Sequence, residues 1–142
     1  MASGFFATLL ASGPSTPLSK YTFANGVLYL GLGASILAWP GQMQLLGAAP
    51  FQGQEEGLVR ALGFTMMVIG WLYAMGARTR ADSFGLATVV DRVFVPIVFA
   101  AFALTGAVDP HLVVPIAVLD PTLALGAYVV WRRSRSSDHR AR

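Results

Sequence analysis

The chain has 142 residues, of which 55% are hydrophobic and only 12% are charged, with a formal net charge of +3. Its mean hydropathy of +0.60 excludes an ordinary water-soluble domain and indicates one small membrane domain. With no cysteine and only two histidines, disulfides, thiolate nucleophiles and iron–sulfur ligation are excluded, and we predict neither a metal site nor a cofactor.

Three segments are expected along the chain. Residues 1–20 form an N-terminal segment that either lies in the membrane interface or is disordered. Residues 21–131 form the membrane domain, and residues 132–142 form a basic cytoplasmic tail. The first apolar run is short and no basic region precedes it, so it is a poor signal peptide.

Four stretches are apolar and long enough to cross a membrane, which takes about 20 mainly apolar residues. They lie at 21–40, 58–77, 84–108 and 112–131. None shows sustained apolar–polar alternation, and backbone groups in lipid must be satisfied within a segment, so all four are expected to be helices. The predicted fold class is all-α: an integral membrane four-helix bundle with antiparallel, up-down spans.

The first span ends at Trp39–Pro40–Gly41, where an interfacial aromatic residue is followed by helix-stopping residues. Asn25 and Tyr29 lie about 7–13 Å inward from Lys20 at 1.5 Å per residue. Packing requires neither side chain, so we place both in a candidate ligand-binding pocket.

The second span opens with Glu56 and Arg60, four residues apart in the favourable acid-then-base order. A structural helix pair explains them, and an outer-side ligand site is the alternative. Gly63 and Gly70 follow on one face, where small residues let membrane helices approach closely. Packing within the bundle is the first interpretation of this face, and homodimerisation through it is the second.

Trp71 and Tyr73 lie near the inner end of the second span. Aromatic residues near a membrane interface normally form a belt, which is one interpretation of both. In the other, both line the same ligand pocket as Asn25 and Tyr29.

Ionisable residues stand out in the last two spans. A charge at membrane depth is unfavourable by roughly 2.5–3.5 kcal/mol on insertion scales and usually faces a partner or a cavity. Arg92 in the third span and Asp120 in the fourth lie roughly 13 and 16 Å from the inner ends of their helices at 1.5 Å per residue. We predict an ion pair between them and kinks at Pro96 and Pro121. The kinks either open a water-accessible cavity beside the pair or serve only helix packing.

Asp91 directly precedes Arg92 but points about 100° away around the helix, so the two cannot serve one narrow site equally. An alternative is that the third span begins at Arg92. Asp91 and Arg92 would then lie at the interface, and residues 93–108 would form a short span.

The charges alternate between the connections. Basic residues follow the fourth span and fill the connection around Arg78, whereas Glu55, Glu56 and Asp109 lie in the opposite loops. By the positive-inside rule, this predicts a multi-pass protein of the bacterial inner (plasma) membrane with both termini cytoplasmic. A basic tail beside a membrane is typical of contact with anionic lipid, so no nucleic-acid partner is expected.

Four short features resemble the DoxX-like group of small four-helix bacterial membrane proteins. They are the Trp39–Pro40 stop, the run Arg60-Ala61-Leu62-Gly63, an arginine near the start of the third span (Arg92) and a lone aspartate in the fourth (Asp120). The resemblance covers about residues 21–133 and implies a four-helix bundle in a group that includes accessory redox subunits. Asp91, and Pro121 directly after Asp120, depart from the pattern and could mark a specialised site.

Three functions fit these features. The first is a binding or accessory protein, alone or in a larger membrane complex, whose pocket holds a lipid-like, quinone or isoprenoid molecule. The second is a membrane enzyme for isomerisation, epoxide opening or cyclisation of an apolar substrate. In it Asp120 is the general acid or base, Asp91 or Tyr29 assists, and Arg92 positions the substrate. The third is a dimeric proton-coupled transporter with Asp120 as the exchanging carboxylate.

Overall fold

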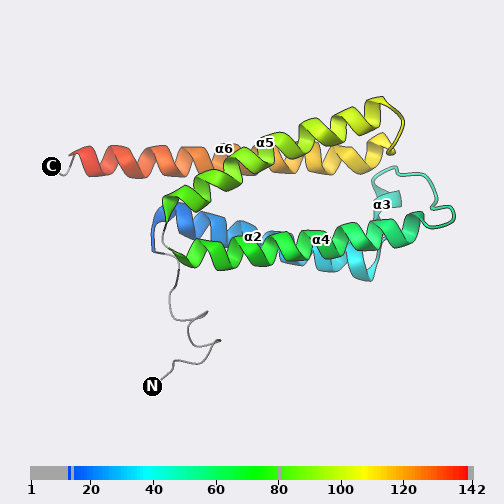
Figure 1. The fold of residues 1–142 in the computed structure, drawn as a ribbon, viewed down its shortest axis with the longest axis horizontal. Coiled ribbons are helices and arrows are strands. Elements are labelled where there is room, and N and C mark those ends of the chain that lie inside the picture. The colour runs from blue at the N-terminus through cyan, green and yellow to red at the C-terminus, as the bar shows by residue number, and fades with distance from the viewer. Residues whose placement is uncertain (1–12, 14, 80, 141–142) are drawn as a thin grey trace, which may run out of the picture.

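The computed structural model describes residues 13, 15–79 and 81–140, and these form helices joined by short loops, with no strand among them (Figure 1). The elements are α2 (Pro17–Ala38), α3 (Gln42–Leu45), α4 (Glu55–Gly76), the 3-10 turn η1 (Ala77–Thr79), α5 (Asp82–Leu104) and α6 (Pro110–Arg140). Four helices, at 17–38, 55–79, 82–104 and 110–136, are long and apolar enough to cross a membrane. The predicted all-α fold with four spans is confirmed.

Helix boundaries differ from the prediction where local capping decides them. α2 begins at Pro17 because the Thr16 hydroxyl accepts the backbone N–H of Ser19, and the Ser19 hydroxyl accepts that of Thr16. α5 ends at Leu104, short of the predicted residue 108, because Gly106 adopts a positive φ of 73° and closes a Schellman turn.

The long helices extend into both predicted end segments. α6 continues as one helix to Arg140, so residues 132–140 of the expected tail extend the fourth span as a helix. Residues 17–20 of the expected N-terminal segment, residues 1–20, belong to α2, whereas residues 1–12 and 14 lie outside the described residues. α5 and α6 also run through Pro96 and Pro121 without interruption, and kinks at these prolines stay a prediction.

The long helices form two antiparallel hairpins. α2 packs mainly on α4, and α5 mainly on α6, while α2 also contacts α5 and α6 and so joins the hairpins (Figure 1). At one end, the Thr16 hydroxyl donates to Asp82 at 2.9 Å and ties the start of α2 to the start of α5. At the other end, the Ala49 N–H donates to Asp109 at 3.0 Å and ties the α3–α4 loop to the α5–α6 turn.

Glycines make the α2–α4 contact unusually close. A Cβ atom added at Gly26, Gly33, Gly63 or Gly70 would lie only 2.5–2.7 Å from a backbone atom of the facing helix. Small residues at such crossings let the backbones themselves come into van der Waals contact. Gly63 and Gly70 are therefore used within the chain, as the first interpretation held, and α2 covers the face proposed for homodimerisation.

Candidate functional site

Two tyrosine–aspartate hydrogen bonds lie between the hairpins, and each of the four long helices contributes one of the four side chains. Tyr29 of α2 donates to Oδ1 of Asp120 on α6, and Tyr73 of α4 donates to Oδ2 of Asp91 on α5 at 2.5 Å. Tyr29, Tyr73 and Asp120 are 6%, 7% and 5% exposed, whereas Asp91 lies at the exposed margin. We call these four residues the tyrosine–aspartate cluster.

Arg92 lies behind the two tyrosine rings and is 1% exposed. Its Cζ atom is 4.8 Å from the ring centroid of Tyr73 and 5.6 Å from that of Tyr29, within the range of cation–π attraction. None of its three guanidinium nitrogens has a hydrogen-bond partner in the part of the chain that the structure describes. The arginine is therefore held by aromatic faces and by through-space attraction to the nearby carboxylates.

The predicted direct ion pair between Arg92 and Asp120 is not formed. Asp120 bonds instead to the Tyr29 hydroxyl, while the Tyr29 ring packs against the guanidinium, so that this one phenol links the two residues. Arg92 and Asp120 do lie at a similar level along their helices, as predicted, since Tyr29 contacts both. Asp91 and Arg92 serve the site unequally, as their angular separation predicts: the carboxylate bonds to a phenol and the guanidinium stacks.

A cavity of about 200 Å³ adjoins the cluster between α4 on one side and α5 and α6 on the other. Its polar margin consists of the four cluster residues, and Arg92 is not among the residues that line it. The other lining side chains are almost all apolar: Leu62, Thr65, Met66, Ile69, Val95, Phe99, Ile116 and Leu119. These wall residues are missing from the prediction, because only the pairing of the helices brings them together.

Asn25 is buried on α2, four residues before Tyr29, but does not line the cavity, contrary to the prediction. Thr22, which the prediction missed, is fully buried on the same helix, and both side chains have a polar atom without a hydrogen-bond partner among the described residues. Positions 22, 25 and 29 recur with the spacing of one helix face, which is the sequence signal that could have revealed Thr22. Trp71 is 46% exposed and does not line the cavity, so its placement in the pocket is wrong and the belt interpretation fits it.

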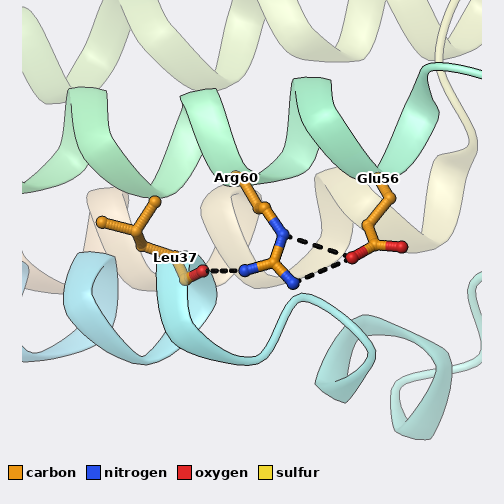
Figure 2. Close-up of polar contacts among 3 residues, drawn as sticks. All are labelled: Leu37, Glu56 and Arg60. Carbon is orange, nitrogen blue, oxygen red and sulfur yellow. Dashed lines mark hydrogen bonds and ion pairs between the residues drawn. The ribbon is translucent and has the colours of Figure 1, made fainter.

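Glu56 and Arg60 lie at the far end of α4 from Tyr73 and form a structural link. Nη2 and Nε of Arg60 donate to Oε1 of Glu56 at 2.8 and 3.2 Å, and Nη1 donates to the backbone carbonyl of Leu37 (Figure 2). Leu37 lies in the last turn of α2, where carbonyl groups have no partner within the helix. Arg60 thus caps α2 from α4 and complements its dipole, which favours the structural interpretation of this pair.

Replacing Arg60 with methionine is expected to lower the free energy of unfolding by about 1–2 kcal/mol. A charged hydrogen bond to a helix-terminal carbonyl is lost, while the surface ion pair itself contributes little. Glu56→Gln, which leaves the capping bond intact, is the matched control and should cost about 0.5 kcal/mol or less. Thermal unfolding in one detergent measures both, and equal losses would show that the carbonyl bond is unimportant.

Asp109 organises the loops at this same end of the bundle. Its carboxylate accepts the backbone N–H groups of Ala49 and His111 at 3.0 and 2.9 Å and lies 3.0 Å from Nδ1 of His111. The hydrogen bond from Ala49, followed by those from His111, lowers the pKa of Asp109 below its ordinary value. The ionised carboxylate therefore holds the α3–α4 loop against the start of α6.

Among the residues that the structure describes, no three His, Asp or Glu side chains are grouped so as to hold a metal ion. No protein-family model matches the chain, and no curated protein or solved structure is significantly similar to it. A function for this protein therefore has to be inferred from the chemistry of the cavity and of the tyrosine–aspartate cluster.

Proposed function

We propose that this small membrane protein binds a lipid-like molecule, such as a quinone or an isoprenoid, in the cavity beside the tyrosine–aspartate cluster. The supporting observation is a cavity of about 200 Å³ within the membrane-crossing helices, with apolar walls and polar groups at one margin. Ligand sites typically combine such walls with a few convergent polar groups. The resemblance to the DoxX-like group, with its accessory redox subunits, is compatible with a binding role.

The polar margin suits a neutral hydrogen-bonding group. Tyr29 and Tyr73 each already donate to a carboxylate, and the second lone pairs of the carboxylates and phenols remain as acceptors. Each interaction made there is strengthened because apolar side chains surround it. A hydroxyl group on an otherwise apolar molecule would therefore be held at this end of the cavity.

The test is to fill the cavity. Ile116→Trp places a bulky indole ring in the cavity wall, and Ile97→Trp makes the same substitution at an exposed position on α5 outside the cavity. We expect native mass spectrometry of the gently purified protein to show a bound apolar molecule in wild type and in Ile97→Trp, and little or none in Ile116→Trp. Equal occupancy in all three proteins, or none in wild type, would count against the proposal.

An acid–base enzyme is the second candidate, favoured by the hydrogen bond between Tyr29 and Asp120 at the cavity margin. A carboxyl group joined to a phenol can exchange a proton with a bound substrate, as isomerisation, epoxide opening or cyclisation requires. Asp120→Asn keeps the shape of the side chain and should abolish conversion of an isoprenoid epoxide by the purified protein. Unchanged conversion in this variant would exclude Asp120 as the acid or base.

We further propose that both termini face the cytoplasm of a bacterial inner membrane. Most of the basic residues gather at the end of the bundle that carries η1 and the end of α6. The acidic loop residues Glu55 and Asp109 lie at the other end, where Arg60 is paired with Glu56. In cells, a cysteine introduced at Gln54 is expected to react with an impermeant maleimide, and one at Ser136 is not. The opposite labelling pattern would reverse the topology.

A further inference from the structure

A second cavity, of about 300 Å³, lies at the outer end of the hairpins. The α3–α4 loop lines it with Ala48, Ala49 and Phe51, and its other walls include Leu58 of α4 and Leu112 of α6. The bond from Ala49 to Asp109 holds this loop in place. Apart from Glu55 and Asp109, whose carboxylates are bonded to backbone N–H groups, the side chains that line it are apolar.

The two cavities share two lining residues, Leu62 of α4 and Phe99 of α5. Both are half-buried, and they stand on helices whose main partners are α2 and α6 rather than each other. The outer cavity and the cavity beside the cluster, here called the inner cavity, therefore border the same two side chains, which we call the neck. Asp120 and Leu112 are eight residues apart on α6, so the path spans about 12 Å at 1.5 Å per residue.

We infer that the ligand is an elongated alcohol whose hydroxyl group lies at the tyrosine–aspartate cluster and whose apolar chain passes the neck into the outer cavity. This inference rests on the proposed function and adds the shape and the polar group of the ligand. The inner cavity alone, at about 200 Å³, is smaller than the usual range of about 300–1,000 Å³ for small-molecule sites. The outer cavity supplies the missing apolar space in line with it.

Charge placement selects the polar group. Asp91 and Asp120 border the inner cavity, whereas the guanidinium of Arg92 lies behind the two tyrosine rings and does not border it. An anionic head group would meet carboxylates before it met the arginine, in surroundings where like charges repel strongly. Both phenols already donate to carboxylates, so the polar margin offers free acceptor lone pairs. A hydroxyl group can donate to one of these, which an ionised fatty acid cannot do, so an alcohol fits where a fatty acid does not.

The chain-length dependence of binding tests this arrangement. Leu62→Trp narrows the neck, and Leu72→Trp makes the same substitution at an exposed position on α4. We expect Leu62→Trp to bind hexadecanol on the order of tenfold more weakly than Leu72→Trp does. The narrowed neck keeps part of the chain out of the outer cavity, and the methylene groups left outside are no longer buried. Hexanol, which is short enough for the inner cavity, should bind the two variants about equally. Equal binding of hexadecanol to both variants would overturn the role of the neck.

A photoreactive alcohol gives a second readout that needs no variant. Hexadecanol with a diazirine at the chain end should label wild-type protein at the outer cavity, on residues such as Phe51, Leu58 or Leu112. Labelling confined to exposed surface residues such as Phe94 would overturn the inference. The preference for an alcohol would be overturned if unlabelled palmitic acid displaced the photoreactive probe as effectively as unlabelled hexadecanol does. If neither alcohol bound wild-type protein while native mass spectrometry still showed a bound apolar molecule, this inference would fail and the proposed function would stand.

Discussion

Replacing Gly70 with alanine is expected to lower the free energy of unfolding of the bundle by about 3 kcal/mol. A Cβ atom there would lie 2.6 Å from the backbone nitrogen of Leu30 and 2.7 Å from the carbonyl oxygen of Gly26. Both are backbone atoms, so relief requires α2 and α4 to move apart along their whole contact. That movement would also separate Tyr29 from Tyr73, whose ring centroids are 5.7 Å apart.

Gly31→Ala is the matched control on α2. No atom lies within 4 Å of a Cβ added there, and alanine is a better helix former than glycine by about 1 kcal/mol. The control should therefore leave stability unchanged or raise it. Thermal unfolding of both variants in the same detergent measures the difference, and equal behaviour would show that the α2–α4 contact is looser than described.

Arg92→Met is expected to destabilise the protein by about 3–5 kcal/mol, because it keeps most of the side-chain volume but removes the positive charge beside two carboxylates. Arg92→Lys should recover only part of this loss, since an ammonium group stacks less well than a guanidinium against the rings of Tyr29 and Tyr73. Unfolding in detergent at neutral pH measures the series. A neutral effect of Arg92→Met would mean that the carboxylates do not need this charge.

The double variant Arg92→Met/Asp120→Asn separates charge balance from packing. With the buried carboxylate neutralised as well, much of the loss seen in Arg92→Met should be recovered, even though no direct bond joins the two residues. Recovery will be incomplete because Asp91 remains. If the loss of stability in the double variant equalled the sum of the losses in Arg92→Met and in Asp120→Asn, the two charges would not interact across Tyr29.

The depth of the ionisable residues was predictable, and their partners were not. Helix rise is fixed, so sequence position alone places Arg92 and Asp120 at one level. Which helix lies between them depends on how the hairpins pack, and α2 supplies Tyr29 there. The sequence indicates the level of each residue along its helix but not the side chain that it contacts. The predicted direct ion pair is therefore replaced by a link through the phenol of Tyr29.

The aromatic residues of α4 show the same limit. Trp71 and Tyr73 are two residues apart and so point about 200° from each other around the helix, which means that one pocket can take only one of them. The sequence does not say which, because the face that meets the bundle is set by the glycine contact with α2. That contact turns Tyr73 inward toward Arg92 and leaves Trp71 exposed.

The convergence of the four helices on one site can be measured by cross-linking, because the chain has no cysteine of its own. Cysteines placed at Tyr29 and Asp120, whose side chains are hydrogen-bonded, should be joined in membranes by a short, permeant bifunctional maleimide. The pair Tyr29 and Val118 is the control, since Val118 lies near the same level of α6 but is exposed. Cross-linking of the first pair alone is the predicted result, and efficient cross-linking of only the second would contradict the site.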